Sequence, residues 1–232
     1  MAARNEHIYK KINMSTKAEE NYLKAIFKLF EKEHKSVSTN AISEELETKP
    51  SSVSDMLKKL SEKDLINYIK YQGVSLTPLG YSLAVNVIRK HRLWEVFLVN
   101  HLNFKWDQVH DIAEQLEHIK SIELVNRLDS FLNFPSYDPH GDPIPNKEGN
   151  IEKMNQKVLI ELHELQKGII TGVKKGTASL LSYLDKEKIK LGDKIQVLEI
   201  IEFDGTFIVD INGRKYTFSE KICQNLLFET YD

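Results

Sequence analysis

The order of patterns in the first third of the chain constrains its fold most. Three segments repeat apolar side chains at helical spacing, and two short segments rich in β-branched and aromatic residues follow them. The helical segments are residues 16–33, 40–47 and 51–63, and the strand segments are residues 65–71 and 74–77. Helix, short helix, turn, helix and hairpin is the order of a winged helix-turn-helix domain, which we predict for residues 1–78.

The third helical segment offers a polar surface that suits a nucleic-acid backbone. Small hydroxyl groups at a helix N-terminus let phosphates approach the backbone N–H groups, and longer polar groups one turn later reach base edges. Serines there also cap helices, and taken alone they favour that structural role. The complete element order favours DNA binding instead. The candidate DNA-contacting residues are Thr39, Asn40, Lys49, Pro50, Ser51, Ser52, Ser54, Asp55 and Lys58.

Charge is divided unevenly along the chain, although its net value is only −2. Residues 1–90 carry 15 Lys and Arg against 11 Asp and Glu, whereas residues 91–232 carry 17 against 23. A basic N-terminal part and an acidic C-terminal part are typical of a chain whose first part binds a polyanion and whose second part binds a cation. The single cysteine, Cys223, excludes an internal disulfide. Without a secretion signal or a membrane-spanning apolar run, we expect a cytoplasmic protein.

The middle of the chain concentrates metal-ligand side chains. Residues 79–102 predict one long helix, in which His91 and Glu95 fall within the apolar stripe. A carboxylate on an apolar face is costly unless it is paired or bound to a metal. A His–Glu hydrogen bond inside a core would explain this pair if it stood alone.

The next predicted helix, residues 106–119, favours a metal site over that structural explanation. Four candidate ligands share about 100° of its circumference. They are His110, Glu114, Glu117 and His118. A solvated charged stripe would normally include Lys or Arg one turn away, and this stripe has none. With the preceding pair, two successive helices offer six imidazole and carboxylate donors.

The rear of the chain predicts a linker and a small β domain. Residues 134–149 hold four of the six prolines, and short alternating segments follow them. The clearest strands are residues 195–202, 206–211 and 214–218, joined by Asp-Gly and Asn-Gly turns. We therefore predict an SH3-like barrel over residues 151–232 and a helical domain over 79–150. The chain as a whole is predicted to be mainly α with small β parts.

Four motifs carry a family resemblance that spans almost the whole chain. They are Lys49-Pro-Ser-Ser-Val-Ser54, Arg89-Lys-His-Arg-Leu93 with Glu95, W-x-x-V-H-x-x-A-E-x-L-E-H at 106–118, and Asp138-Pro-His-Gly-Asp-Pro-Ile-Pro145. The sequence resembles the diphtheria-toxin-repressor and manganese-transport-regulator family of metal-activated transcriptional repressors. The resemblance implies a winged-helix DNA-binding domain, a helical metal-binding and dimerisation domain and an SH3-like domain. It also implies activation by Mn(II) or Fe(II) and a homodimer on double-stranded operator DNA.

By position, the resemblance implies two sets of metal ligands. One set is His91, Glu95 and His110, and the other is Glu114, Glu117 and His118 with Asn21. The iron-responsive branch has Met at the position of Asn21 and Cys at that of Glu114, whereas the manganese branch has Asp and Glu. Glu114 therefore favours Mn(II), with Fe(II) second. Lys24 stands where the manganese branch has a Glu ligand.

We predict a metal-dependent repressor of metal-homeostasis genes that is not an enzyme and takes no organic substrate. Two alternatives stay open: a winged-helix regulator that responds to an organic ligand, and a helical di-metal carboxylate enzyme. The enzyme class repeats Glu-x-x-His on two helices, which this chain lacks. Apolar residues beyond what helix packing needs also predict a two-fold interface. They are Trp94, Phe97, Leu98, Val99, Leu102, Phe104 and Trp106.

Overall fold

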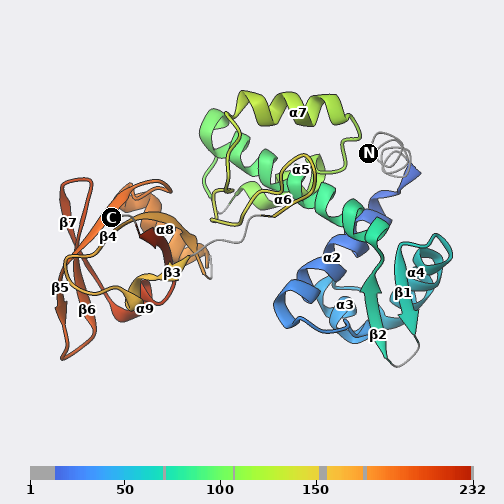
Figure 1. Cartoon of the computed structure of the whole chain (residues 1–232), viewed down its shortest axis with the longest axis horizontal. Coiled ribbons are helices and arrows are strands. Elements are labelled where there is room, and N and C mark those ends of the chain that lie inside the picture. Colours follow the sequence, from blue (N-terminus) through green and yellow to red (C-terminus); the bar gives the residue numbers. More distant parts are fainter. Residues whose placement is uncertain (1–13, 70–71, 107, 152–155, 175–176, 231–232) are drawn as a thin grey trace. The chain divides into compact units, whose positions relative to one another are not determined.

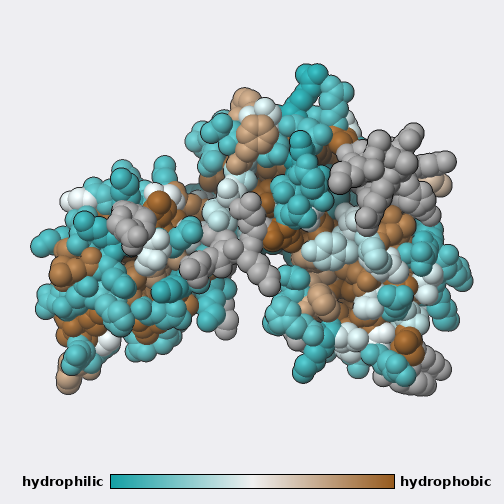
Figure 2. Space-filling view, viewed as in Figure 1, coloured by the Kyte–Doolittle hydropathy of each residue, from teal (hydrophilic) through white to brown (hydrophobic). Residues whose placement is uncertain are grey.

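The computed structural model describes residues 14–69, 72–106, 108–151, 156–174 and 177–230, and the chain forms two compact units (Figure 1). The first unit comprises residues 1–91, 114–126 and 145–150, and the second comprises residues 92–113, 127–144 and 151–232. In the described part of the chain, every helix is too short or too polar to cross a membrane. Figure 2 shows hydrophilic side chains over much of the visible face of each unit.

The first unit begins with the predicted winged helix-turn-helix. Its elements are α2 (Lys17–Glu33), α3 (Thr39–Glu45), α4 (Pro50–Glu62), β1 (Ile66–Ile69) and β2 (Gly73–Leu76). Thr16 caps α2 through a reciprocal capping box with Glu19, and Pro50 occupies the first turn of α4. The antiparallel β1–β2 hairpin forms the wing. The predicted element order is therefore confirmed.

The core of this domain fixes α2 against α3, α4 and the wing. Its fully buried side chains come from all of these elements and are Leu23, Ile26, Ile42, Val53, Leu57, Leu60 and Val74. Helix α5 (Pro78–Leu102) then packs closely on the domain at Gly80, where a Cβ atom would lie 1.9 Å from the carbonyl oxygen of Leu65. Only glycine allows this approach, so the long helix starts from a fixed position in the first unit.

The helix predicted over residues 106–119 is shorter in the structure. Helix α6 runs from Val109 to Leu116. A turn follows it, closed by a hydrogen bond of 3.1 Å from the N–H of Ile119 to the carbonyl of Leu116. Glu117 and His118 lie in this turn. The prediction that they share one helical stripe with His110 and Glu114 is therefore wrong. A further helix that the sequence reading missed, α7 (Ile122–Phe131), follows and is capped by the hydroxyl of Ser121.

The second unit contains the predicted C-terminal β domain. Its sheet is antiparallel, with the strand order β3-β8-β4-β5-β6-β7. The strands are β3 (Lys157–Val158), β4 (Lys167–Val173), β5 (Lys194–Ile201), β6 (Thr206–Ile211), β7 (Arg214–Phe218) and β8 (Leu226–Thr230). A 3-10 turn (Leu159–Glu161) and two helices, α8 (Ala178–Glu187) and α9 (Glu220–Cys223), complete it, and α8 was not expected. Cys223 is buried in the core of this domain.

The proline-rich segment is packed against the β domain. A Cβ atom on Gly141 would lie 2.2 Å from the Cα atom of Gly172 in β4, and the N–H of Val173 donates to the carbonyl of His140 at 3.0 Å. The carboxylate of Asp138 accepts from the N–H groups of His140 and Asp142 at 2.8 and 2.9 Å. These contacts hold the backbone of residues 138–142 in place and so fix the positions from which the side chains of Asp138 and His140 extend.

Candidate metal centres

The first centre surrounds a buried lysine. The Nζ atom of Lys24 on α2 lies 2.6 Å from Oε1 of Glu114 and 2.6 Å from Oε2 of Glu117, and 3.4 Å from Nδ1 of His91. Nδ1 of His91 also lies 2.7 Å from Oε2 of Glu117. Three of the predicted metal ligands thus gather around an ammonium group that the chain itself supplies.

Both partners of this lysine are held close to it by charge. Burial opposes ionisation of Glu114, but the charge and hydrogen bond of Lys24, with smaller contributions from the charges of His91 and Lys28, lower the pKa of this carboxyl group. Glu117 is fully buried, whereas the Glu114 side chain is 34% exposed. A buried ammonium is tolerated only when it is paired, and Glu114 and Glu117 supply this pairing.

His118 is oriented by Glu20, a residue that the sequence reading did not single out. Nδ1 of His118 lies 2.6 Å from Oε2 of Glu20, whose other oxygen accepts from the hydroxyl of Ser15 at 2.6 Å. Burial opposes ionisation of Glu20, but these hydrogen bonds and the charge of Lys90 lower the pKa of its carboxyl group. Because an ionised carboxylate only accepts, Nδ1 of His118 donates, and in the neutral ring the lone pair is then on Nε2.

The free donor atoms of this centre are suited to a divalent cation. Nε2 of His118 lies 3.8 Å from Oε1 of Glu117, and that oxygen is buried without a hydrogen-bond partner among the described residues. The amide oxygen of Asn21 on α2 is also buried and lacks such a partner. Buried polar atoms are normally bonded, so the unsatisfied oxygen of Glu117 near the imidazole of His118 fits a metal that prefers oxygen and nitrogen, and Asn21 offers a second unsatisfied oxygen on α2.

A second centre lies in the second unit around Glu95. One carboxylate oxygen of Glu95 lies 3.4 Å from Nδ1 of His110, and the other lies 3.6 Å from Nδ1 of His140. Ligand atoms of Glu95, Asp138 and His140 all lie within 4.8 Å of one another. Glu95 and Asp138 are buried, whereas the His110 side chain is 52% exposed. These residues offer two carboxylates and two imidazoles at one place.

Two groups of the second centre, His140 and Asp138, have strongly raised pKa values. Burial opposes the charged form of His140, but the hydrogen bond and charge of Glu95 and the charge of Asp138 raise the pKa of this imidazole to about 9. Burial, together with the nearby carboxylates of Asp142 and Glu95, raises the pKa of Asp138 to about 7. The guanidinium of Arg92 lies 3.6 Å from a carboxylate oxygen of Asp138 and partly offsets this shift.

Within each unit, the structure brings some of the predicted ligands together. In the first unit His91 contacts Glu117 and Lys24, and in the second unit Glu95 contacts His110 and His140. Asp138 and His140 were predicted only as part of a family motif and not as metal ligands. The sequence pattern that could have identified them is an Asp and a His two residues apart in a proline-rich segment, together with Glu95 on an apolar helix face.

The predicted DNA-contacting residues lie at the start of α3, at Lys49 and along α4. Thr39 and Ser54 are half-buried, and the other seven are exposed. Lys58 lies 3.7 Å from the carboxylate of Asp55, and the hydroxyl of Ser54 donates to the carbonyl of Pro50 at 3.0 Å. No side chain caps α4 at Lys49, so the first N–H groups of this helix face no capping group of the chain.

The apolar surface predicted for dimerisation is partly used inside the second unit. Trp106 is only 6% exposed and belongs to the core of the β domain, and Leu98 is buried as well. These two residues are therefore unavailable to a partner, which corrects the predicted patch. Leu102 and Phe104 are exposed, and so is Phe131 of α7, which lies beside His101 with ring centroids 4.7 Å apart.

Comparison with known proteins matches the same three parts of the chain. Residues 14–74 match the N-terminal DNA-binding domain of iron-dependent repressors, residues 77–146 match their metal-binding and dimerisation domain, and residues 157–230 match the FeoA domain. The iron-dependent repressor IdeR of Mycobacterium leprae is 35% identical over 126 residues, and the alignment spans 54% of each chain. The chain thus spans about half the length of this relative.

Two further relatives match nearly end to end. The diphtheria toxin repressor of Corynebacterium diphtheriae is 27% identical over 90% of this chain and 96% of its own length. A solved manganese-dependent transcriptional repressor in complex with manganese is 33% identical, with a TM-score of 0.72, over 92% of this chain and 100% of that one. The proteins of this family are transcriptional repressors, not enzymes. The chain belongs to the diphtheria-toxin-repressor and manganese-regulator family of metal-dependent transcriptional repressors.

Proposed function

We propose that this chain is a manganese-responsive repressor that binds operator DNA as a homodimer and controls metal-homeostasis genes. The observation that carries the proposal is the pair of facing donors at the first centre, Nε2 of His118 and Oε1 of Glu117, 3.8 Å apart. Because a repressor must reach its operator DNA, we propose that the protein is cytoplasmic. We keep three domains, at residues 1–78, 79–150 and 151–232.

The donor set supports Mn(II) over softer metals. Glu117 and Asn21 offer oxygen, His118 offers nitrogen, and the one cysteine of the chain, Cys223, lies in the β domain. A site built from oxygen and imidazole suits Mn(II) and, second, Fe(II), whereas thiolates favour softer metals. A bound ion would supply a divalent charge shared by these three side chains. Glu20 keeps the His118 ring in the tautomer that this role requires.

Lys24 supports a single divalent ion at this centre. Its ammonium already neutralises one oxygen each of Glu114 and Glu117, and it contacts His91 as well. A second divalent ion between those groups would have to displace a buried positive charge. We therefore propose Asn21, Glu117 and His118 as the ligands, with Glu114 and His91 holding the lysine. A second ion would bind at Glu95, Asp138 and His140, with His110 as a further donor.

The position of the first centre supports coupling to DNA. Helix α2 carries Glu20, Asn21 and Lys24, and the same helix packs inside the winged-helix core with α4. Side chains from the end of α6 therefore act directly on the DNA-binding domain. If these contacts are stronger in the DNA-competent arrangement, metal shifts the population toward it. In a dimer, two α4 helices would enter successive major grooves, about 34 Å apart along the DNA.

Metal-dependent operator binding tests the proposal. An operator is selected from a random duplex library, and its fluorescence anisotropy is followed while Mn(II), or Fe(II) without oxygen, is added to metal-free protein. We expect Mn(II) to drive binding, EDTA to reverse it, and elemental analysis to find bound metal. The His118→Gln variant should keep its fold by circular dichroism and lose the response. Activation by Fe(II) alone would contradict the manganese assignment, and operator binding indifferent to EDTA would contradict metal dependence.

Light scattering tests the homodimer. The exposed apolar residues Leu102, Phe104 and Phe131 support a two-fold contact. We expect a dimer at micromolar concentration and a shift toward monomer in a variant that combines Leu102→Ser with Phe131→Ser. A monomeric wild-type protein, with metal and without it, would contradict this part of the proposal.

A further inference from the structure

The buried carboxylate of Glu19 links two helices of the first unit. Its side chain is 1% exposed, and Oε1 lies 2.7 Å from Nζ of Lys63 and 3.1 Å from Nζ of Lys59. Glu19 lies in the first turn of α2, whereas Lys59 lies in the last turn of α4 and Lys63 caps that helix. One carboxylate oxygen therefore joins the start of α2 to the end of α4.

The other oxygen of Glu19 holds the backbone of its own turn. Oε2 accepts from the N–H of Thr16 at 3.1 Å, and the hydroxyl of Thr16 accepts from the N–H of Glu19 at 3.2 Å. This reciprocal capping box keeps the first turn of α2 in one conformation. A single side chain thus connects the α2 backbone to α4.

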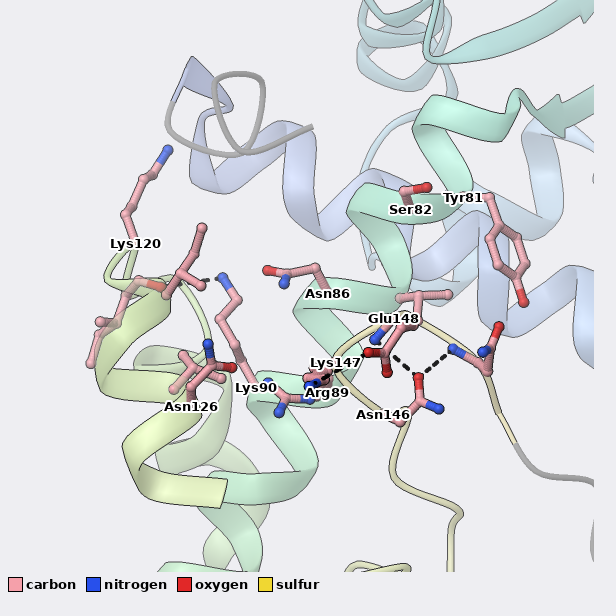
Figure 3. Close-up of a pocket in the computed structure, with 16 residues that line it drawn as sticks. Tyr81, Ser82, Asn86, Arg89, Lys90, Lys120, Asn126, Asn146, Lys147 and Glu148 are labelled. Atoms are coloured by element: carbon pink, nitrogen blue, oxygen red, sulfur yellow. Dashed lines mark hydrogen bonds and ion pairs between the residues drawn. The ribbon is translucent and has the colours of Figure 1, made fainter. Parts of the chain in front are cut away.

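The same turn of α2 also contacts the first metal centre. The carboxylate of Glu20 lies 2.6 Å from Nδ1 of His118, and the amide oxygen of Asn21 is buried without a hydrogen-bond partner among the described residues. The ammonium of Lys120 donates to the carbonyl of Ser15 and lies 3.9 Å from Glu20. Figure 3 shows the Lys120 side chain extending from the segment that leads into α7. The start of α2 is therefore in contact with both the metal centre and α4.

Apolar packing already joins α2 to α4, so the ion pairs are not needed merely to hold the two helices together. The buried core includes Leu23 and Ile26 of α2 and Leu57 and Leu60 of α4. Apolar contact is non-directional, and the cost of desolvation offsets much of the attraction within a buried ion pair. A charge-assisted hydrogen bond has a defined length and direction. Glu19 is therefore suited to fix how α4 lies along α2.

We propose that Glu19 is a positioning residue through which the first metal centre acts on α4. The proposal rests on the proposed function, because it requires that bound metal favours operator binding. An ion held by Asn21 would restrain the first turn of α2, and the Glu19 carboxylate would pass this restraint to Lys59 and Lys63. The opposite end of α4, which carries the candidate DNA-contacting serines, would then keep the position that operator binding requires.

The main test measures coupling between metal and DNA. The coupling factor is the ratio of the operator dissociation constants in EDTA and in saturating Mn(II), or in Fe(II) without oxygen if only that ion activates. Glu19→Gln keeps the capping box, in which glutamine also serves, and removes the charge that holds the two lysines. We expect a factor of about 10 or more in the wild type and one at least about fivefold smaller in this variant.

The lysine partners provide an independent variant. Lys59→Gln combined with Lys63→Gln should lower the coupling factor as Glu19→Gln does, whereas Lys59→Arg combined with Lys63→Arg keeps both charges and should retain most of it. The factor is a ratio, so a direct contact of either lysine with DNA changes both dissociation constants and leaves the ratio as a measure of coupling. Circular dichroism checks the fold of each variant, and the lysine variants decide the question if Glu19→Gln does not fold.

A second readout needs neither metal nor DNA. In EDTA, backbone amides of α4 should exchange hydrogen faster in Glu19→Gln than in the wild type. Glu31→Gln removes the same charge from an exposed position of α2 and should match the wild type in exchange and in coupling. Ile42→Val lowers stability by shrinking a buried side chain and leaves the ion pairs intact, so it should keep the coupling factor.

Three outcomes would overturn the proposal while the metal response of the wild type stands. The first is an unchanged coupling factor in Glu19→Gln. The second is a loss in Glu19→Gln but not in the Lys59 and Lys63 double glutamine variant, which would place the effect in the α2 cap alone. The third is an equal loss in Ile42→Val, which would reduce the effect to general stability. Wild-type operator binding that ignores both metals would contradict the proposed function itself, and this inference with it.

Discussion

The Nζ atom of Lys24 lies 2.6 Å from Oε2 of Glu117, the oxygen that is also 2.7 Å from Nδ1 of His91. The other oxygen of the same carboxylate has no hydrogen-bond partner among the described residues and lies 3.8 Å from Nε2 of His118. Glu117 is thus neutralised on one side by a charge built into the chain and left with a donor atom on the other.

Removing this built-in charge is expected to destabilise the metal-free protein. Lys24→Met leaves two close carboxylates without their cation, and loss of one partner of a buried ion pair typically costs about 3 kcal/mol or more. Urea unfolding in EDTA should therefore give a lower free energy of unfolding than in the wild type. Mn(II) should restore part of the loss, because it supplies the missing positive charge. Lys35→Met is the matched control, and equal stability of the two variants would contradict this account.

Replacing the same lysine by a ligand is expected to change the metal count. Lys24→Glu adds a carboxylate where the ammonium now lies, so a second divalent ion can bind between it, Glu114 and Glu117. Calorimetry with Mn(II) should show one more ion per chain than in the wild type. An unchanged count would mean that Lys24 does not occupy a cation position.

Glu20 is expected to act on metal affinity without being a ligand. Glu20→Gln keeps the size of the side chain but weakens the hydrogen bond that orients His118. Loss of such an orienting carboxylate typically lowers metal affinity about 10–100-fold. The Mn(II) dissociation constant should rise by this factor in Glu20→Gln, and more in His118→Gln. Glu44→Gln, on an exposed position of α3, serves as the control.

The second centre is expected to bind metal with proton release. The pKa of His140 is raised to about 9, so the imidazole is protonated at neutral pH and must lose its proton to bind a metal. Metal affinity at this centre should therefore rise as the pH increases toward 9. Calorimetry in buffers of different ionisation enthalpy measures the released protons, which should decrease in His140→Gln. Affinity that falls over this range would refute the assignment.

The raised pKa of His140 also makes the stability of the protein without metal depend on pH, and here the stabilisation falls as the pH rises. The folded-state pKa of His140 lies above its ordinary value of 6.5, so the charged ring stabilises the fold fully below that pH. This contribution is lost as the pH rises through about 9. The difference in unfolding free energy between wild type and His140→Gln should therefore shrink from pH 6 to pH 9.5, in EDTA.

Substitutions on α4 are expected to affect either the overall affinity for DNA or the preference for one sequence, depending on the residue. Lys58→Ala should weaken binding to all duplexes and reduce the salt slope by about 1, because we propose that this exposed lysine contacts phosphate. Asp55→Ala should instead change which operator is preferred. Ser54→Ala should also do so if the Ser54 hydroxyl leaves its bond to the carbonyl of Pro50. Unchanged operator affinity in all three variants would exclude α4 as the reading element.

A thiol at position 114 is expected to change metal choice, because this position neighbours the proposed ligand Glu117, although Glu114 itself holds Lys24. Glu114→Cys replaces a hard carboxylate beside the centre with a soft thiol, so operator activation should shift toward Fe(II), Co(II) or Zn(II) and away from Mn(II). The measurement is anisotropy of the labelled operator against the concentration of each metal, compared with the wild type. Raw affinity is a poor readout here, since Mn(II) binds weakest of these ions to almost any site. Unchanged order of the activation midpoints would contradict a role for this carboxylate in selectivity.

Local sequence signals were sufficient for the order of elements in the winged-helix domain and for strands β5 to β7, but not for α7 and α8. The capping pair of Thr16 and Glu19, the proline at the start of α4 and the alternation in β6 each act within a few residues of the chain. Their physical cause is short-range, in backbone hydrogen bonds and side-chain spacing. The end of α6 at Leu116 was misjudged, because the apolar spacing continues into a turn that only packing reveals.

The sequence by itself determined which residue types are available to bind a metal and which part of the chain reads DNA. Tertiary structure alone decided which donors meet. Lys24 and Glu114 are 90 residues apart in the chain, and Glu20 and His118 are 98 residues apart, yet each pair forms a hydrogen bond of 2.6 Å. Such pairs depend on how helix α2 packs against the end of α6, and no local periodicity encodes that distance. The lysine that looked like the loss of a ligand therefore proved to be a cation within the centre.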